Sequence, residues 1–590
     1  MALQQYYALG AAVRITRTIQ QRRSPRRHRF ACLVASTLSL LGCPGLSAAG
    51  HAATPDPLVA AHGAVASDHP EASKAGVVML KAGGNAIDAA CATALALGVV
   101  NPHGSGIGGG GFAVIYLAKE KQVHVLDFRE RAPAAITPAM FFKDGKPDPK
   151  LSRQGGLAVG VPGEVLGLSE MVKRWGKLPF SRCVAPAEKL TQGVAATPRV
   201  AWMINDVMSK DPFINQVFTF KGPVKPGDRL RRPVLGRTLA LLRQKGPKVF
   251  YQGAIGEDIA ATVRAAGGVM TAEDLRNYTV SDREPVTTTY RGLRIVTMPP
   301  SSSGGTVVAT ALAILERIAA KPRELGHNSS AYLHALAEAL KHGFADRARH
   351  LGDSDFVKVP LDKLLAPAYQ AELAARFKPD SVLPSAQYGR PGESPTVPND
   401  GGTAHLSVID EEGNAVALTT TVNLWFGAHL VSERYGIVLN NQMDDFAMKP
   451  GVENAFRLLG TEKNAVAPHK RPLSSMTPTL VFDDKGVKIA VGGAGGPTII
   501  SGTLQVLLNI VDFGMDAQAA SSAPRIHHQW MPELLMYEPE LPVDVIKALE
   551  KRGHKTQPRD QLTKVNVVVR TDKGFEAAAE VRGDGLPAGL

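Results

Sequence analysis

The amino-acid sequence predicts a protein of mixed α and β structure, in the α/β (α+β) class. Three observations carry this prediction. Residues 86–99 form an alanine-rich apolar run typical of a buried helix, and residues 405–409 and 415–422 alternate with the period of two expected for strands. A glycine run at 492–498 then precedes an apolar helix at about 499–511. At 590 residues the chain could hold roughly two to four domains by length alone.

The start of the chain is typical of an export signal. Seven arginines and no acidic residue lie before Asp56, and they precede a short apolar run at 31–42 and then small residues. The run is too short to span a membrane as a helix. We therefore expect residues 1–52 to be an export segment and the mature protein to be periplasmic or secreted. Two interpretations of Cys43 stay open: it could be the lipidated residue of a lipoprotein box at 40–43, or a chance cysteine in an ordinary signal.

Charge and cysteine content exclude other classes of function. The net charge is +13, and 13 minus the 7 arginines of the export segment leaves +6 for the rest. That remainder has no Lys/Arg stripe, so we expect no nucleic-acid partner. Cys91 and Cys183 are too few for a disulfide framework, and Cys91 lies in the apolar run.

Between the export segment and residue 400 the pattern mixes helices and strands. Two strands are expected within 114–128, on either side of 119–121, and helices are expected at 162–175 and 330–350. Residues 379–400 contain Pro, Ser, Gly and Asn without periodicity and are expected to be irregular. Beyond them, the strands at 405–409 and 415–422 are expected to form a hairpin. A second strand pair, with its turn at 483–486, is expected after it.

The hairpin after residue 402 has a predictable register. Its loop, 411–413, ends in glycine. If Asp410 pairs with Asn414, then Thr403 lies opposite Thr421. One face of the two strands is then apolar, and the other carries Thr403, Thr421, His405, Ser407, Thr419 and Asn423. Two interpretations remain open: a half-exposed hairpin, or a sheet with core on one side and chemistry on the other.

Two glycine-containing segments indicate acyl chemistry. Thr403 follows Gly401 and Gly402, and a hydroxyl at this place can attack the preceding carbonyl and cut the chain. A threonine freed in this way carries a nucleophile and a base together, as its hydroxyl and its α-amine. Glycines before a helix, as in 492–498, present free N–H groups suited to a phosphate or to the oxyanion of acyl transfer.

Three other patterns could indicate a metal or cofactor site, but each is weak evidence. We expect neither a metal nor a cofactor. Asp444-Asp445 could be a solvated turn or a metal site, although no other ligands have metal spacing. His527 and His528 are adjacent, so on a strand they point to opposite faces. Residues 104–109 fit Gly-x-Gly-x-x-Gly, but no βαβ unit surrounds them.

Several long motifs resemble those of the γ-glutamyltranspeptidase family, which are N-terminal nucleophile hydrolases. They occur in the family's order and extend over nearly everything after the export segment. They are residues 83–90, 105–112, 127–130, 267–271, 299–305, 410–416, 439–446, 470–479, 495–496 and 523–530.

The resemblance implies a four-layer αββα sandwich and a precursor that cuts itself before Thr403. Residues 53–402 would form the heavy subunit and 403–590 the light subunit. It implies that Thr403 is the nucleophile and that Thr421 positions it. It also places Gly495 and Gly496 in the oxyanion hole.

The resemblance further assigns the two charged ends of a glutamyl substrate. Arg129, Ser474 and Ser475 would bind its α-carboxylate, and Asn423, Gln442 and Asp445 would receive its α-ammonium group. A bidentate guanidinium suits a carboxylate. Without the resemblance, Arg129 beside Glu130 would more often be a surface ion pair.

The implied activity is cleavage of glutathione and other γ-glutamyl compounds, with transfer of the acyl group to water, an amino acid or a peptide. Two alternatives remain: an acylase for glutaryl or cephalosporin-type substrates, and an unprocessed, non-enzymatic surface protein. The chain departs from the family at Ala404, at 424–426, and at Phe456 in the lid loop 450–460, where a gating tyrosine is often found. Phe456 cannot hydrogen-bond to Asn423 through its side chain.

Overall fold

The computed structural model describes residues 55–220, 222–388, 402–449 and 451–590. The predicted export segment with Cys43, and residues 389–400 of the irregular stretch, lie outside the described residues. Within the described ranges, no helix combines the length and apolar character that a membrane span requires.

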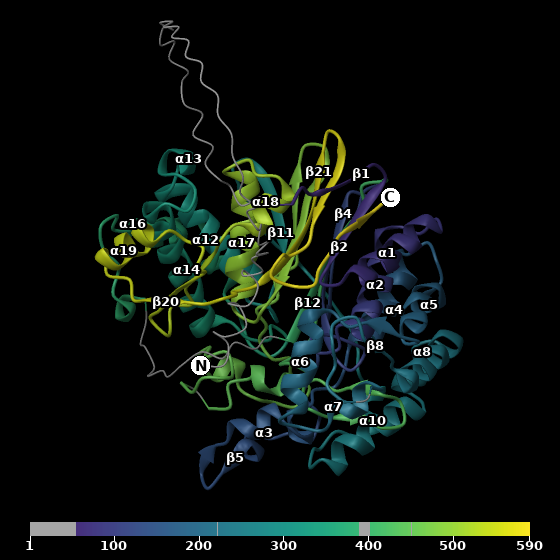
Figure 1. Ribbon diagram of the computed structural model, residues 1–590. Coiled ribbons are helices and arrows are strands. Elements are labelled where there is room, and N and C mark those ends of the chain that lie inside the picture. The colour runs from purple at the N-terminus through teal and green to yellow at the C-terminus, as the bar shows by residue number, and fades with distance from the viewer. Residues whose placement is uncertain (1–54, 221, 389–401, 450) are drawn as a thin grey trace, which may run out of the picture. The chain divides into compact units, whose positions relative to one another are not determined.

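Two seven-stranded sheets form the centre of the fold (Figure 1). The strand order of the first sheet is β23 (Ala588–Gly589), β2 (Gly63–Ser67), β12 (Gly402–Asp410), β13 (Ala415–Asn423), β3 (Gly110–Leu117), β4 (Gln122–Phe128) and β9 (Ser281–Arg283). The order of the second is β1 (Leu58–Ala60), β22 (Gly574–Ala578), β21 (Lys564–Thr571), β17 (Gly486–Ala494), β16 (Thr479–Asp483), β11 (Leu293–Thr297) and β10 (Val286–Tyr290). Every pairing within the two sheets is antiparallel.

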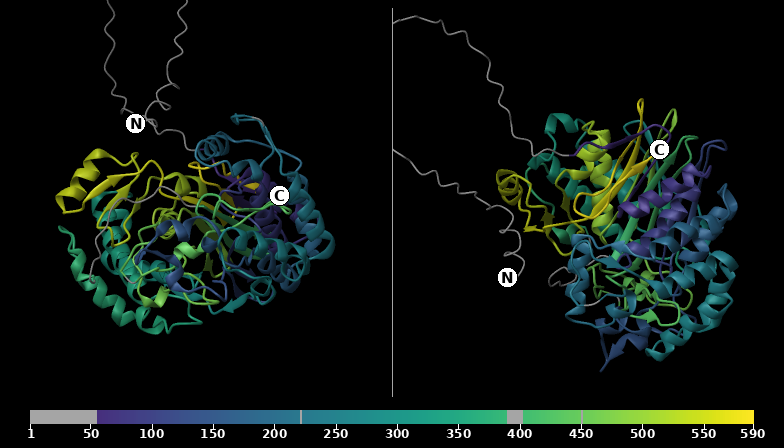
Figure 2. Two further views of the ribbon diagram at one scale, coloured as in Figure 1. Left: turned by 90° about the horizontal axis from the view of Figure 1, so that it is seen from below. Right: turned by 45° about the vertical axis from the view of Figure 1, so that its right-hand side comes forward.

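The sheets pack face to face, and helices cover their outer faces, as the views in Figure 2 also show. The helical layer on the first sheet contains α1 (Pro70–Lys81), α2 (Ala86–Val100), α4 (Glu164–Trp175), α5 (Phe180–Leu190) and α8 (Pro233–Lys245). The layer on the second contains α12 (Gly304–Ile318), α14 (Ser330–His350), α17 (Thr498–Val511) and α18 (Ala517–Ser522). One apolar core lies between each sheet and its helices, and a third lies between the sheets. The four-layer αββα prediction is confirmed.

Segments from both sides of the 402/403 junction contribute to both sheets. β12 and β13 lie between β2 and β3, and β16 and β17 lie between β11 and β21. A cut before Thr403 would therefore leave two chains that share both sheets and their cores. The two products would not be separate folding units.

Most predicted elements are present, with small shifts at their ends. The helix expected at 330–350 has those bounds as α14, and the run at 86–99 forms α2, which is fully buried. The helix expected at 162–175 begins two residues later as α4 (Glu164–Trp175). Cys91 is fully buried within α2, as predicted for a small apolar residue.

The hairpin register is confirmed, with Ile409 opposite Ala415 and Thr403 opposite Thr421. Every residue of β12 and β13 is buried, so the interpretation as a half-exposed hairpin is wrong. The apolar face packs against α2, and the hydroxyl-rich face packs against the second sheet. Ser407, for example, donates from Oγ to the Asn566 carbonyl of β21 at 3.2 Å.

Candidate active site

Thr403 is the second residue of β12 and lies beside a bulge. The register shifts between Gly402 and Thr403, so the irregularity falls at the peptide bond before the threonine. Thr403 Oγ1 lies 3.1 Å from Thr421 Oγ1, and both residues are buried. A Cβ on Gly402 would lie 2.7 Å from the carbonyl oxygen of His103. The glycine before Thr403 is therefore required by close packing, a reason that the sequence pattern did not reveal.

The hydroxyl of Thr421 connects Thr403 to the carbonyl that precedes it. Thr421 Oγ1 donates to the Gly402 carbonyl at 2.7 Å and accepts from the Asn423 N–H at 2.8 Å. Because a hydroxyl has one hydrogen, Thr421 can meet the Thr403 hydroxyl only as an acceptor in this arrangement. A hydrogen-bonded chain thus runs from Thr403 Oγ1 through Thr421 Oγ1 to the Gly402 oxygen. It can carry a proton to that oxygen as Thr403 Oγ1 attacks the Gly402 carbon.

Thr403 and Thr421 lie on the wall of a small cavity. Every site residue predicted from the sequence lines this cavity except Gly495, which adjoins the lining residue Gly496. Residues from distant parts of the chain therefore converge on one place. The lining is completed by Phe456, Leu458, Met476, Pro497 and Ile499.

Arg129 and Asp445 form the charged part of the cavity. Arg129 Nη2 donates to Asp445 Oδ2, and Gln442 Nε2 donates to the same oxygen at 2.8 Å. Both charged residues are buried, with Arg129 only 1% exposed, so the surface ion pair and the solvated turn are wrong interpretations. Burial raises the pKa of Asp445, and the neighbouring guanidinium of Arg129 opposes that shift by favouring the carboxylate.

The backbone and side chain of Arg129 are held by partners that sequence reasoning missed. Arg129 Nε donates to the Pro472 carbonyl at 3.2 Å, and Tyr278 donates from its hydroxyl to the Arg129 carbonyl at 2.8 Å. The Arg129 N–H donates to Asp127 Oδ1 at 3.0 Å, and that carboxylate is also paired with Arg471 at 3.1 Å. Asp127 was part of the motif at 127–130, but nothing in the sequence placed Arg471 beside it.

Burial favours the protonated form of two carboxyl groups, Glu130 next to the cavity residue Arg129 and Glu164 in α4. Glu130 is 4.0 Å from Arg129 Nη1, neither of its oxygens has a hydrogen-bond partner among the described residues, and burial raises its pKa to about 8. Glu164, in the first turn of α4, accepts a hydrogen bond from Thr420 of β13. Burial raises the pKa of Glu164 well above its usual range. Neither buried carboxyl group was predicted from the sequence.

Ser474 and Asn423, on the rest of the cavity wall, are held by hydrogen bonds that involve backbone groups. Ser474 Oγ accepts from the Met476 N–H at 3.0 Å, and Ser303 donates from Oγ to the Ser474 carbonyl at 2.7 Å. Asn423 has a φ of 79°, in the left-handed region, and donates from Nδ2 to the Asn441 carbonyl at 3.0 Å. Ser475 and Asn423 both line the cavity.

Gly495 and Gly496 form the turn between β17 and α17. Their φ angles are 144° and 63°, values that glycine adopts readily and other residues rarely adopt. Among the described residues, neither backbone N–H donates a hydrogen bond to another protein group. The turn therefore offers two free donors next to a helix N-terminus, the arrangement that an oxyanion requires.

Phe456 covers Gly496 from the predicted lid loop, whose residue 450 lies outside the described ranges. A Cβ on Gly496 would lie 2.7 Å from the Phe456 ring. The N–H groups of Phe456 and Leu458 both donate to Asn454 Oδ1, and Gln529 donates to the Phe456 carbonyl. Phe456 is buried, and its position is held by these backbone hydrogen bonds and by the packing of its ring on Gly496.

The histidines have local partners. His527 Nδ1 lies 2.8 Å from Ser501 Oγ, whereas His528 Nδ1 accepts from the Trp530 N–H, so the two adjacent rings do not share a site. In the described part of the chain, one buried group has ligand types within metal-binding range. It consists of His334, Glu338 and His554, in which the two rings hydrogen-bond to one another at 2.8 Å, and it does not line the cavity.

Comparison with known proteins gives a consistent family match. The model of the family described as Gamma-glutamyltranspeptidase matches residues 72–590. The glutathione hydrolase proenzyme of Escherichia coli (strain K12) is 40% identical over 550 residues, which is 90% of this chain and 93% of the relative.

Solved structures agree with the fold. A cephalosporin acylase from Bacillus halodurans matches with a TM-score of 0.80 and 28% identity, over 92% of this chain and 99% of that one. The γ-glutamyltranspeptidase of Helicobacter pylori matches with a TM-score of 0.53 and 40% identity, over 58% of this chain and 97% of that one.

Proposed function

The chain belongs to the γ-glutamyltranspeptidase family, and from that premise we propose that it is a self-processing γ-glutamyltransferase and glutathione hydrolase. It cleaves the γ-glutamyl amide of glutathione and related compounds and passes the acyl group to water or to an amino acid or peptide. The observation that carries the proposal is the cavity that joins the Thr403–Thr421 hydroxyl pair to the Arg129–Asp445 charge pair.

The first reaction is self-cleavage before Thr403. Thr403 Oγ1 attacks the Gly402 carbonyl carbon, and its proton moves through Thr421 to the Gly402 oxygen. As this intermediate collapses, the proton passes from the Gly402 oxygen to the Thr403 nitrogen, the Gly402–Thr403 C–N bond breaks, and an ester on Thr403 remains. Water hydrolyses the ester to give a heavy subunit ending in the Gly402 carboxylate and a light subunit, 403–590, with a free amine on Thr403. The relative from Escherichia coli is named a proenzyme, which supports a precursor.

The freed Thr403 then catalyses turnover. Its α-amine takes the proton from Oγ1 as that oxygen attacks the γ-carbonyl of the substrate. The N–H groups of Gly495 and Gly496 stabilise the oxyanion, the C–N bond breaks with protonation of the amine leaving group, and a γ-glutamyl ester on Thr403 remains. Water or an acceptor amine attacks that ester, regenerating the hydroxyl and releasing glutamate or a new γ-glutamyl compound.

Recognition exchanges a charge pair within the protein for charge pairs with the substrate. Arg129, with the hydroxyls of Ser474 and Ser475, binds the α-carboxylate. Asp445, with Gln442 and Asn423, receives the α-ammonium group. In the structure Arg129 and Asp445 are paired with one another, which compensates both buried charges.

The charges at the cavity distinguish this substrate class from that of a glutaryl acylase. A glutaryl group has a carboxylate for Arg129 but no ammonium group for Asp445. When a glutaryl group binds Arg129, the buried Asp445 carboxylate loses Arg129 as its partner and gains no ammonium group in exchange. The comparison of γ-glutamyl and glutaryl anilides therefore tests the substrate class directly.

Export of the protein is also proposed. Its support is the set of seven arginines between positions 14 and 29, followed by an apolar segment at 31–42. The mature enzyme would be periplasmic or secreted, and a lipid on Cys43 would add a membrane anchor.

One measurement on purified protein tests processing, export and lipidation together. An intact-mass spectrum should show two chains, the smaller beginning at Thr403, and a heavy chain lacking residues 1–52 or carrying a lipid on Cys43. The variant Thr403→Ala should stay a single chain and release no glutamate. A wild type that never splits and still releases glutamate would refute the mechanism.

A further inference from the structure

The glycine turn beside Thr403 is held by two threonine hydroxyls that bind its carbonyl groups. Thr563 Oγ1 donates to the Ala494 carbonyl at 2.8 Å, and Thr498 Oγ1 donates to the Gly495 carbonyl at 2.8 Å. Neither threonine lines the cavity. Both therefore contact the turn without forming part of the cavity wall.

These two carbonyls determine where the proposed oxyanion donors point. A peptide group is planar and trans, so its C=O and the N–H of the next residue point in opposite directions. The Ala494 carbonyl shares a plane with the Gly495 N–H, and the Gly495 carbonyl shares one with the Gly496 N–H. Glycine lacks the Cβ that restrains such planes elsewhere, and both φ angles lie in the region open to glycine. Without the hydroxyl bonds, each plane could rotate at low cost.

The threonines are themselves anchored by a buried cluster of four charged residues. Arg525 Nη1 donates to the Thr563 carbonyl at 2.8 Å, and Glu538 Oε1 accepts from the Leu562 N–H at 3.2 Å. The Leu562 carbonyl is a second acceptor within reach of the Thr498 hydroxyl, so the one hydrogen of Thr498 is shared between the Leu562 and Gly495 carbonyls. The peptide of 562–563 is therefore held from the charged cluster on one side and binds the glycine turn on the other.

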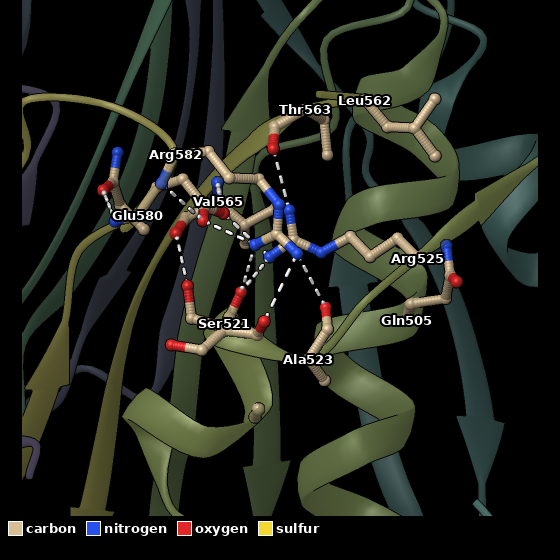
Figure 3. Close-up of polar contacts among 12 residues, drawn as sticks. Gln505, Ser521, Ala523, Arg525, Leu562, Thr563, Val565, Glu580 and Arg582 are labelled. Carbon is tan, nitrogen blue, oxygen red and sulfur yellow. Dashed lines mark hydrogen bonds and ion pairs between the residues drawn. The ribbon is translucent and has the colours of Figure 1, made fainter. Parts of the chain in front are cut away.

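The two arginines and two glutamates of the cluster compensate one another's charges. Arg525 pairs with Glu580 at 2.8 Å, and Arg582 pairs with Glu580 at 2.7 Å and with Glu538 at 2.6 Å. Figure 3 shows the Arg525 guanidinium directed at the Thr563 carbonyl and at Ser521, with Arg582 and Glu580 beside it. Buried ion pairs with several hydrogen bonds fix geometry more than they add stability.

We propose that Thr498 and Thr563 are positioning residues that aim the N–H groups of Gly495 and Gly496 at the substrate oxyanion, and that the cluster of Arg525, Arg582, Glu538 and Glu580 holds them in place. The inference rests on the proposed function, since it takes these N–H groups as the oxyanion donors. It assigns a catalytic consequence to polar groups that lie outside the cavity.

Substitutions at Thr563 can separate the hydroxyl from the methyl. The methyl packs against α17 so closely that Gly502 has no room for a side chain. Thr563→Val keeps a methyl there and removes the hydroxyl, whereas Thr563→Ser keeps the hydroxyl and removes the methyl. If the hydroxyl matters, Val is the damaging change. If only packing matters, Ser is.

The test measures self-cleavage and turnover separately in each variant. Self-cleavage uses the Gly402 carbonyl, which Thr421 binds, so its rate on a gel should be unchanged in Thr563→Val. Turnover of a γ-glutamyl anilide should fall about ten- to a hundredfold in kcat with KM near the wild-type value, because the oxyanion forms only in the transition state. Thr563→Ser should retain wild-type kcat, and inhibition by glutamate should be the same in all three proteins.

Equal kcat in wild type and Thr563→Val, or a larger loss in Thr563→Ser, would overturn the proposal. Should Thr563→Val not fold, Thr498→Val against Thr498→Ser gives the same comparison. Arg525→Lys should lower kcat on its own. Combined with Thr563→Val it should lower kcat no further, since both substitutions act through the Thr563 hydroxyl. Additive losses in the double variant would show that the cluster does not act through this hydroxyl. An inactive wild type would overturn the proposed function and this inference with it.

Discussion

Thr403 and Thr421 face one another across β12 and β13 with their hydroxyl oxygens 3.1 Å apart, before any cut in the chain. The pair is thus built by the register of one hairpin and does not await cleavage. Thr421 also donates to the Gly402 carbonyl. The nucleophile Thr403, the proton-carrying hydroxyl of Thr421 and the bond to be broken are therefore neighbours at one end of the hairpin.

Thr421→Val should slow self-cleavage strongly, because it removes both the acceptor for the Thr403 proton and the donor to the Gly402 oxygen. Loss of one hydrogen bond to a developing oxyanion costs roughly 10²–10³ in rate. A gel time course of freshly purified precursor measures the effect. Thr421→Ser keeps the hydroxyl and is the matched control; it should cleave within about tenfold of wild type. Equal cleavage of the Val and Ser variants would remove Thr421 from the mechanism.

Asp445→Asn should raise KM for γ-glutamyl anilide by about tenfold or more, because a charged hydrogen bond contributes about 1.5–3 kcal/mol. The substitution keeps the shape of the side chain and removes its charge. Glutaryl anilide, which has no ammonium group, should not be weakened in the same way, so the preference for the γ-glutamyl compound should shrink. A variant that retains the full preference would place the ammonium group elsewhere.

Glu130 should make the protein less stable as pH rises. Burial raises its folded pKa to about 8, against 4.5 unperturbed, so between these values the native state holds a proton that the unfolded chain has lost. The contribution of Glu130 is complete below pH 4.5 and is lost as pH rises through 8, with a slope of at most about 1.4 kcal/mol per pH unit. Arg129 works against this shift, while Asp445 and Asp127 add to it.

Melting temperatures of wild type and Glu130→Gln between pH 5 and about pH 9 check this prediction. Glutamine resembles the protonated acid, so the two curves should meet at low pH and separate above it, with the variant more stable. Other buried carboxyls contribute equally to both proteins and cancel in the difference. Parallel curves would mean that Glu130 titrates as an ordinary carboxyl.

The sequence predicted the local features of the site well. Period-two alternation and a three-residue loop were enough to place Thr421 opposite Thr403, because strand pairing in a hairpin follows from the loop. The helix at 330–350 was predicted with its observed bounds. The resemblance to the family supplied Arg129 and Asp445, which no local pattern would have joined.

Features that depend on tertiary packing were missed. Arg129 and Glu130 read as a surface pair, since adjacent charges are usually solvated and only the packed fold buries them. Arg471 beside Asp127, and Arg525 beside Thr563, are contacts between segments far apart in sequence. No pattern within one segment reports such contacts, and a cluster of this kind becomes visible only once both sheets are assembled.

Phe456 should control which nucleophile reaches the γ-glutamyl ester. Its ring packs on Gly496 and lines the cavity, and its loop is held by Asn454 and Gln529. Phe456→Ala removes the ring and leaves space for water beside Thr403, so the fraction of ester captured by a dipeptide acceptor should fall by at least about threefold relative to hydrolysis. Phe456→Tyr keeps the ring and should stay near the wild-type ratio. The measurement is the ratio of γ-glutamyl-dipeptide to free glutamate at fixed acceptor concentration. If Phe456→Ala and wild type give the same ratio, the ring does not exclude water, and acceptor choice must depend on another part of the cavity wall.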